Sequence, residues 1–489
     1  MTKTLNWRYV VKVLGMFILF EIAFLLVSTG VSIFYGEDDL NAFICTIMLS
    51  AVIAAICLLT GKNSPSVLGR KESYLIVSSV WVVFSLIGML PFMLSGYIPS
   101  AADAFFETMS GFTTTGATIL NNIEDLPHGL LFWRSMTQWV GGMGIVVLYL
   151  AVLPMLNTGT QMFSAESPGP QVTKLRPRIK ETARRLWGMY LIFTLAETVM
   201  LVVFGMSLFD ALCHSFSTLA TGGFSTKQAS VAYWDSPAID YTITLFMIIG
   251  GTNFALMYSA VVKRSSRQIF KDEEFKAYLW IIGIATAIIF LSLLNDNGIS
   301  SFASVEKSFR DSLFQVATLV TTTGFATADY MQWQPMTLVV IAFLMLFGSC
   351  ANSTSGGIKI IRILVTAKNA FLEFKRLIHP KAVVPVRING HVVPEYVVNG
   401  ILAFVTIYIV VVSLSVLLLS IIGMEVSEAI GGVLTCIGNV GPGFGDQGPA
   451  GSFSGVPVFA KWYLSFLMLL GRLELFTLLL MCTPGFWRR

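Results

Sequence analysis

Four segments of this sequence share a pattern that could bind cations. Each begins with an acidic residue, continues with a short apolar stretch and ends in a run rich in threonine and glycine, at residues 103–118, 210–226, 311–327 and 428–445. The glycines at 116, 222, 324 and 441 follow the acidic residues by 13, 12, 13 and 13 positions. These loops have no side chains suited to acid–base catalysis, but their backbone carbonyls could replace the water around a cation. The pattern therefore favours ion coordination over an enzyme.

The lengths of these segments predict that each enters and leaves a membrane on the same face. Non-helical backbone is tolerated at membrane depth only where protein buries it or where it lines a wet cavity. A half-helix of about two to three turns fits the stretch after each acidic residue, with the acid at the positive end of the helix dipole. Its negative end then attracts cations. Glycine is needed at the turn because carbonyls facing one axis require positive φ angles.

We predict a selectivity filter formed by three residues from each loop. One such loop would be consistent with ordinary re-entrant packing, but four at matching positions argue against that reading. The candidate ion-binding residues are Thr114, Thr115, Gly116, Thr221, Gly222, Gly223, Thr322, Thr323, Gly324, Asn439, Val440 and Gly441. The fourth loop is the least regular, since Asn439 stands where the others have threonine or alanine, and this predicts looser selectivity.

Composition and hydropathy identify the chain as an all-α membrane protein. Of its 489 residues, 55% are hydrophobic and only 12% are charged, too few for a soluble protein of this length. Apolar runs of about 20 residues predict ten spans. They lie near 10–35, 41–60, 74–97, 129–156, 186–208, 238–262, 277–296, 335–365, 396–422 and 457–482. Lysine and arginine clusters then fall on one side throughout, which predicts a multi-pass plasma-membrane protein with both termini in the cytoplasm.

The spans and loops together predict four helix–pore loop–helix repeats around one pore, preceded by a two-helix extension. The expected divisions are 1–72 for the extension and 73–158, 159–265, 266–368 and 369–489 for the four pore units.

A gate is predicted where small and polar residues interrupt the eighth span. The interruption covers 348–357, and its candidate gate residues are Gly348, Ala351, Asn352, Ser353, Thr354, Ser355, Gly356 and Gly357. A helix-packing face of small residues is the alternative.

Arg472 lies at a similar depth in the tenth span, where a charge is costly, so we expect it to face the pore as an electrostatic barrier. A structural pair with Glu474 is the alternative.

The loop motifs resemble those of the K⁺ transporter superfamily that includes bacterial Trk and Ktr membrane subunits and the plant and fungal HKT and Trk proteins. The similarity rests on SGFTTTGAT, ATGGFST, TTTGFAT and GNVGPGFG, which begin at 110, 220, 321 and 438. The extra N-terminal spans favour the Trk-type, TrkH-like subunit of the bacterial inner membrane. The resemblance implies K⁺ at the filter, a homodimer and a cytosolic nucleotide-binding partner of the TrkA-like kind. Gly116 stands where the family tunes K⁺ against Na⁺.

Other functions receive less support. GNVGPGFG is flanked by membrane spans, unlike a dinucleotide fingerprint, and the basic residues follow membrane topology, so no nucleic acid or covalently bound cofactor is expected and the surroundings are membrane lipid. A proton- or sodium-coupled symporter stays open, with Glu21, Glu197, Arg472 and Glu474 as its few intramembrane ionisable candidates. A less selective K⁺/Na⁺ transporter and a non-transporting receptor are further alternatives.

Overall fold

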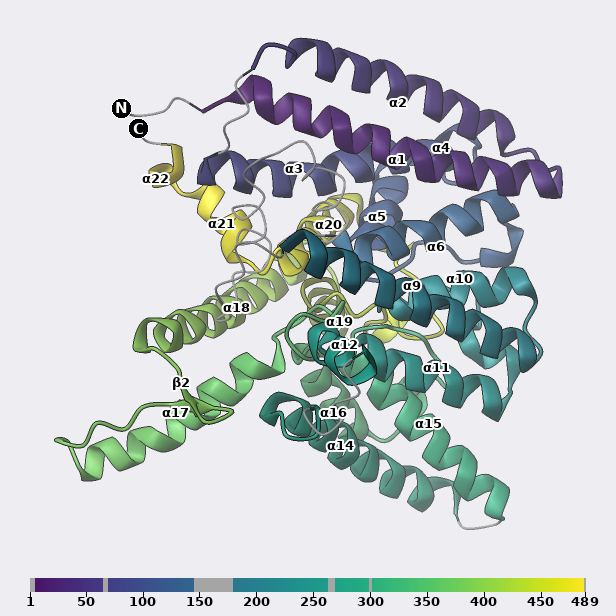
Figure 1. Ribbon diagram of the computed structural model, residues 1–489. Coiled ribbons are helices and arrows are strands. Elements are labelled where there is room, and N and C mark those ends of the chain that lie inside the picture. Colours follow the sequence, from purple (N-terminus) through teal and green to yellow (C-terminus); the bar gives the residue numbers. More distant parts are fainter. Residues whose placement is uncertain (1–4, 65–68, 145–178, 263–268, 299–300, 488–489) are drawn as a thin grey trace.

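The computed structural model describes residues 5–64, 69–144, 179–262, 269–298 and 301–487, and the chain in these parts is mostly helical (Figure 1). Within the described residues, six helices are long and apolar enough to cross a membrane, or eight if each of two bent pairs counts as one span. Many apolar side chains on these helices face outward, among them Val203, Leu291 and Ile421. Outward apolar faces of this kind fit lipid, and the chain is a multi-pass membrane protein.

Two long helices form the N-terminal extension. They are α1 (Trp7–Tyr35) and α2 (Leu40–Thr60), which run side by side at the top of Figure 1. Small residues allow this close approach: a Cβ added at Gly15 would overlap Cys57, and one at Gly61 would overlap Lys12. The α1 helix also packs on α3 and α6, which connects the extension to the first predicted pore unit.

The first two predicted units share an order of long helix, short helix, loop and second helix. The first contains α3 (Arg70–Gly88), α4 (Leu90–Leu94), α5 (Ala101–Phe112), η1 (Ile123–Asp125) and α6 (His128–Gly142). The second contains α9 (Ile179–Val203), α10 (Leu208–Leu219), η3 (Ser230–Trp234), α11 (Pro237–Gly250) and α12 (Phe254–Val262). Most of the span predicted at 129–156 beyond Gly142 lies outside the described residues.

The last two predicted units follow the same order. The third contains α14 (Glu273–Asn297), α15 (Phe302–Val320), η4 (Tyr330–Gln332), α16 (Pro335–Leu346) and α17 (Ile360–Ile378). The fourth contains β1 (Arg387–Ile388), β2 (His391–Val392), α18 (Glu395–Ile421), α19 (Val426–Gly438), η5 (Gly445–Gln447), α20 (Val458–Arg472), α21 (Phe476–Cys482) and α22 (Pro484–Trp487).

Three predicted spans are not continuous helices. The 335–365 span is two helices separated by a loop, and α17 runs on to Ile378. The 238–262 and 457–482 spans bend by 105° and 118° at short breaks. The interruption of the 335–365 span was predicted from its small and polar residues, whereas the other two breaks were not, because they are short and flanked by apolar residues on both sides. The all-α prediction also needs one amendment, because β1 and β2 form a small antiparallel hairpin.

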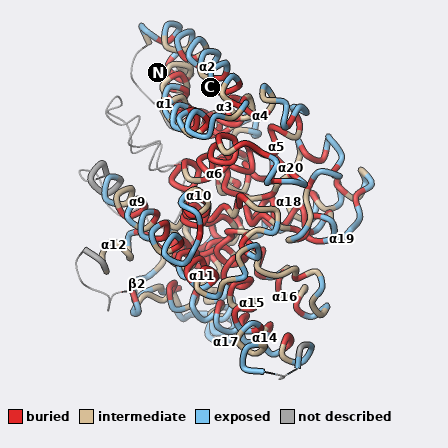
Figure 2. Tube along the Cα trace, turned by 90° about the vertical axis from the view of Figure 1, so that its right-hand side faces the viewer, coloured by how far each residue is buried: buried red, intermediate tan, exposed pale blue. Residues whose placement is uncertain are grey.

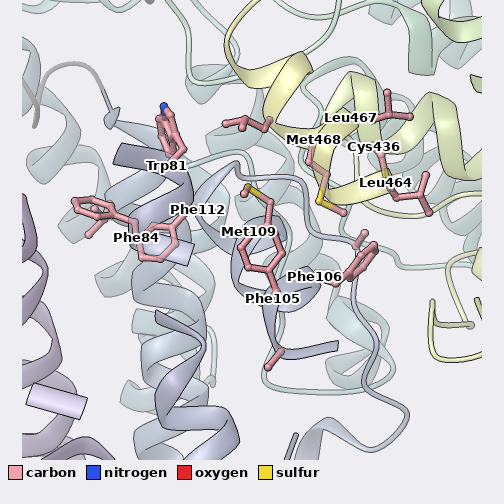
Figure 3. Close-up of a cluster of buried hydrophobic side chains, with 14 of the residues drawn as sticks. Trp81, Phe84, Phe105, Phe106, Met109, Phe112, Cys436, Leu464, Leu467 and Met468 are labelled. Carbon is pink, nitrogen blue, oxygen red and sulfur yellow. The ribbon is translucent and has the colours of Figure 1, made fainter. Parts of the chain in front are cut away.

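Buried residues, drawn in red, concentrate in the middle of the molecule, and the exposed residues lie mainly toward its outside (Figure 2). One apolar cluster joins helices that are distant in sequence (Figure 3). It combines Trp81 of α3 with Phe106 and Met109 of α5, and with Leu464 and Met468 of α20. The first and fourth predicted units are therefore packed against each other, which closes the arrangement into a ring.

Candidate functional site

The helices α5, α10, α15 and α19 all end with the same backbone geometry. In each case a non-glycine residue with a left-handed backbone follows the helix, at Thr114, Thr221, Thr322 and Asn439, with φ angles of 56°, 52°, 56° and 53°. The amide of the next residue then donates to a carbonyl five positions back, at 2.8 to 2.9 Å, in all four loops. This is a helix C-cap of the Schellman type. Four segments of different sequence thus adopt one backbone path.

A glycine with positive φ follows two residues after each left-handed residue. The angles are 84° at Gly116, 76° at Gly223, 86° at Gly324 and 114° at Gly441. Gly222, which the sequence analysis aligned with the other glycines, has no positive φ and stands one place earlier. The register in the second loop is therefore corrected by one residue. All four glycines then follow their acidic residue by 13 positions.

These glycines and the residues before them form a closed cycle, which we call the glycine ring. A Cβ added at Gly116 would overlap the carbonyl oxygen of Gly222, one at Gly223 that of Thr323, and one at Gly324 that of Val440. A Cβ at Gly441 would lie 3.1 Å from the carbonyl oxygen of Thr115. Each loop therefore contacts the next, and the fourth contacts the first. The structure thus brings eight of the twelve predicted filter residues together in this cycle.

The acidic residue that opens each segment has different positions in the four helices. Asp103 and Asp210 lie in first turns, where their amides are capped by Ser100 and Ser207. Asp311 instead lies in the middle of α15, because that helix begins at Phe302. The predicted placement at a helix N-terminus is therefore wrong for the third loop. The amphipathic stretch before Asp311 extends the helix by more than two turns.

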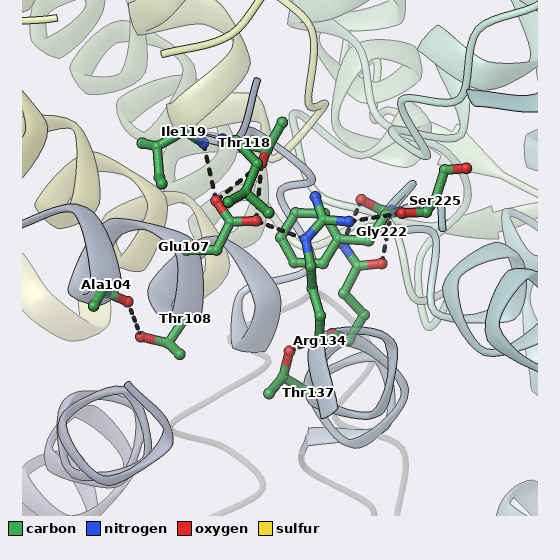
Figure 4. A network of polar contacts seen from close by, with 12 residues as sticks. Ala104, Glu107, Thr108, Thr118, Ile119, Arg134, Thr137, Gly222 and Ser225 are labelled. Atoms are coloured by element: carbon green, nitrogen blue, oxygen red, sulfur yellow. Dashed lines mark hydrogen bonds and ion pairs between the residues drawn. The ribbon is translucent and has the colours of Figure 1, made fainter. Parts of the chain in front are cut away.

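In three of the four loops, a polar side chain four residues after the acid supports the segment that leaves the ring. In the first loop this residue is Glu107, which accepts from the hydroxyl of Thr118 at 2.9 Å and from the amide of Ile119 at 2.9 Å (Figure 4). Glu107 is also paired with Arg134 of α6, at 2.6 Å between Oε1 and Nε, with both side chains buried. Arg134 donates in turn to the carbonyl of Ser225 at 2.8 Å, so this buried pair connects the first and second loops.

The equivalent side chains in the other loops are neutral. His214 Nε2 lies 2.9 Å from the hydroxyl of Ser225, and Gln315 donates to the carbonyl of Ala328 at 3.0 Å. The fourth position is Gly432, and a Cβ there would meet Gln447. The role of the position four residues after each acid, and that of Arg134, were not predicted from the sequence. A signal was available, since each polar residue follows its acid by one helical turn within an apolar stretch.

Residues 348–357, which include the predicted gate residues of the eighth span, form a loop beside the ring. We call it the 348–357 loop. The amide of Gly356 donates to Thr322 Oγ1 at 2.8 Å, and Thr354 Oγ1 lies 3.2 Å from Thr221 Oγ1. A Cβ at Gly356 would overlap the carbonyl oxygen of Gly438, beside Asn439. The loop therefore contacts the helix ends of the second, third and fourth ring segments.

The chain makes a closed excursion between α16 and α17 here and returns to run parallel to its entry, so the loop is more than a kink in one helix. Phe347 and Ile358 pair as an isolated parallel bridge, and the amide of Gly348 donates to the carbonyl of Ile358 at 2.9 Å. Positive φ angles of 55° at Asn352 and 65° at Gly357 make the turns. Of the remaining predicted gate residues, Ala351 directly precedes the first turn, and Ser353 and Ser355 lie between the two turns.

Arg472 ends α20 and connects the loop to the ring. One guanidinium nitrogen donates to the carbonyl of Thr354 at 2.8 Å and lies 3.3 Å from Thr114 Oγ1. The other donates to the carbonyl of Gly141 at 2.5 Å. The alternative partner Glu474 is paired with Arg362 of α17 instead. The structure therefore places Arg472 against the 348–357 loop.

The TrkH family model, described as a cation transport protein, matches residues 39–487. The chain is 38% identical over 494 residues to the Trk system potassium uptake protein TrkH of Salmonella typhimurium, covering 99% of this chain and 100% of that protein. It is 33% identical to the Trk system potassium uptake protein TrkG of Escherichia coli, covering 94% of each. The crystal structure of the potassium transporter TrkH from Vibrio parahaemolyticus matches with a TM-score of 0.88 and 37% identity, covering 99% of this chain and 100% of that one.

Proposed function

Because this chain belongs to the TrkH family of cation transport proteins, we propose that it carries K⁺ into the cell through one pore whose filter is the glycine ring. The family is one of transporters and not of enzymes. The observation that supports the filter is the cycle of contacts in which each glycine lies against a carbonyl of the next loop. Backbone oxygens gathered in this way can replace the hydration shell of a cation.

The architecture that we propose has ten membrane spans, with four pore units after a two-helix extension. The unit divisions are those derived from the sequence, at 1–72, 73–158, 159–265, 266–368 and 369–489. The repeated helix ends and the corrected spacing of 13 residues support four equivalent loops. Lysine and arginine clusters support cytoplasmic positions for both termini, in a bacterial inner membrane.

The gate that we propose is the 348–357 loop, with Arg472 as a charged barrier beside it. Its support is the position of Thr354, whose side chain lies 3.2 Å from Thr221 and whose carbonyl accepts from Arg472. A loop in contact with three ring segments would block the path below the filter.

The proposed partners are a cytosolic nucleotide-binding subunit and a second copy of the chain, in keeping with relatives named as parts of a Trk system.

Flux into liposomes tests this function. Purified protein in proteoliposomes should take up ⁸⁶Rb⁺, and replacing Gly324 with Ala should abolish this uptake because the added Cβ would overlap the Val440 carbonyl. A scaffold or receptor would show no uptake in either protein. Gly283 of α14 is a matched control, because a Cβ there meets nothing within 4 Å.

Coupled uptake is a second candidate, which one observation favours. Glu21 of α1 is buried, and neither of its carboxylate oxygens has a hydrogen-bond partner among the described residues. A Cβ at Gly88 would lie 3.4 Å from Glu21 Oε1 and would overlap Phe112, the last residue of α5. An isolated buried carboxyl is a typical proton-binding group in transporters. Reversal potentials across K⁺, Na⁺ and pH gradients separate a channel from a symporter and also measure K⁺ over Na⁺ selectivity.

A further inference from the structure

A buried carboxylate holds both ends of the 348–357 loop. Glu274 lies in the first turn of α14 and is 3% exposed. Its Oε1 accepts a hydrogen bond from the amide of Ala351 at 2.7 Å and another from the amide of Ile361 at 3.2 Å. Ala351 lies early in the loop, and Ile361 is the second residue of α17. One oxygen atom therefore joins the segment that enters the loop to the helix that follows it.

Hydrogen bonds that a carboxylate accepts from buried amides are among the stronger ones in proteins. The two loop ends are also joined directly, by the amide of Ile360 and the carbonyl of Ser349 at 3.1 Å. The Lys359 ammonium donates hydrogen bonds to the hydroxyls of Ser353 and Ser355, inside the loop. Glu274 differs from these contacts because it belongs to another helix. It therefore ties the position of the loop to the position of α14.

The residues just before Glu274 are held by the β1–β2 hairpin. Asn389 sits at the hairpin turn, with φ of 50°, followed by Gly390 with φ of 79°. Its side-chain nitrogen donates to Asp272 at 2.7 Å, its side-chain oxygen accepts from the Glu273 amide at 2.8 Å, and its amide donates to Glu273 Oε1 at 3.0 Å. One exposed turn residue thus makes three hydrogen bonds to the first turn of α14.

Charges near this contact strengthen it. Lys368 of α17 pairs with Glu273 and donates to the carbonyl of Arg387 at 2.9 Å, so α17, the hairpin and α14 meet at one point. The base of the hairpin is buried through Val386, which packs with Val365 and Val398. The turn itself stays exposed.

We propose that Glu274 is a positioning residue that keeps the 348–357 loop below the filter, and that the hairpin turn at Asn389 controls it through Asp272 and Glu273. This inference rests on the proposed function, because it takes the loop to be the gate. A displacement of the hairpin shifts the first turn of α14, lengthens the bonds from Glu274 and releases the loop. The exposed turn is accordingly the surface on which a cytosolic partner would act.

The test measures the accessibility of the loop and the rate of transport in separate assays. Cys350 lies in the loop, next to Ala351, and is 1% exposed, whereas Cys482 is exposed. We would treat purified, full-length protein with a charged methanethiosulfonate reagent and measure the labelling rate of Cys350 relative to Cys482 by mass spectrometry. The same preparations would then be assayed for ⁸⁶Rb⁺ uptake in proteoliposomes.

Glu274→Ala should raise both the relative labelling of Cys350 and the uptake by about tenfold or more, which corresponds to about 1.4 kcal/mol. Glu274→Gln should restore most of the protection, because an amide oxygen can still accept both amide hydrogens. Asn389→Gly keeps the positive φ of the turn but removes the two side-chain bonds, so it should give an increase of about threefold, a smaller effect than loss of the charge-assisted bonds. Glu373→Ala, which removes an exposed carboxylate of α17, should change neither value.

Unchanged labelling of Cys350 in Glu274→Ala would overturn the inference, whatever the uptake. If Glu274→Ala does not fold, Asn389→Gly decides in its place: a rise supports the inference and wild-type labelling overturns it. Increased labelling without increased uptake would support Glu274 as the positioning residue and would instead contradict the loop as the gate. A double variant no stronger than Glu274→Ala would show that Asn389 acts through Glu274.

Discussion

The glycine ring and the 348–357 loop lie against each other but are built on opposite principles. The ring uses one backbone conformation four times, with a left-handed residue at the matching position and the same helix cap in each loop. The loop occurs in the third predicted unit and is held by side chains from different helices, including Glu274 of α14 and Arg472 of α20. Repetition suits a site where carbonyls surround an ion. Asymmetry suits the gate that we propose, because a single element could then move without disturbing the ring.

The supports of the ring also differ from one another. Glu107 and Arg134 form a buried ion pair between the first two loops, whereas His214 and Gln315 make neutral hydrogen bonds at the equivalent positions. The backbone symmetry is therefore maintained by chemically different side chains. We infer that the first loop depends most strongly on its support.

The largest expected effect is on that support. Glu107→Ala leaves Arg134 charged and buried without its carboxylate, and should reduce the free energy of unfolding by about 3–5 kcal/mol. Unfolding in mixed detergent micelles measures the change. Gln315→Ala should cost less, about 1 kcal/mol, because it only leaves the partly buried carbonyl of Ala328 without this donor. Equal losses for the two variants would contradict the difference between the loops.

A second pair of variants tests the register of the ring. Gly223→Ala places a Cβ against the Thr323 carbonyl at a positive φ, and should lower ⁸⁶Rb⁺ uptake by about tenfold or more, given strain of about 1–2 kcal/mol. Gly222→Ala meets the side chain of Gln138, which can shift, so its loss should be smaller. A larger loss in Gly222→Ala would favour the alignment first derived from the sequence.

The contact between ring and loop is tested at Arg472. Arg472→Gln removes the charge and weakens the bonds to Thr354 and Gly141, and should raise uptake by about threefold to tenfold, the equivalent of about one charge-assisted hydrogen bond. Arg472→Lys should lie between wild type and Arg472→Gln, since a lysine keeps the charge but cannot form the same fork of bonds. Uptake that is unchanged or lower at equal expression would count against the barrier.

The smallest effect is expected at Glu21, outside both regions. Under channel-like transport, Glu21→Gln should leave uptake within about twofold of wild type, because a neutral amide replaces a carboxyl that is costly to ionise inside a membrane protein. Reversal potentials should not follow a pH gradient in either protein. A pH-dependent reversal potential that disappears in Glu21→Gln would establish proton coupling instead.

Much of the site could be predicted from the sequence because its chemistry lies in short local segments. The runs of threonine and glycine identify the loops, and the small residues at 348–357 identify the interruption of the eighth span. The register at Gly222 and Gly223 could not be predicted, because two adjacent glycines can both adopt a positive φ. The role of Glu274 was also beyond the sequence, since its contact with Ala351 joins residues 77 positions apart.

By itself the sequence determined the membrane character of the chain, the four loops and the residues that line them. Hydropathy and glycine placement act locally, and each follows from free energies that a single segment carries. The tertiary structure alone decided which carbonyl faces which glycine, that Arg472 contacts Thr354 instead of Glu474, and that Glu274 joins both ends of the loop. Such contacts depend on how distant helices pack, because a charged side chain in a membrane protein binds whichever polar group the fold brings within reach.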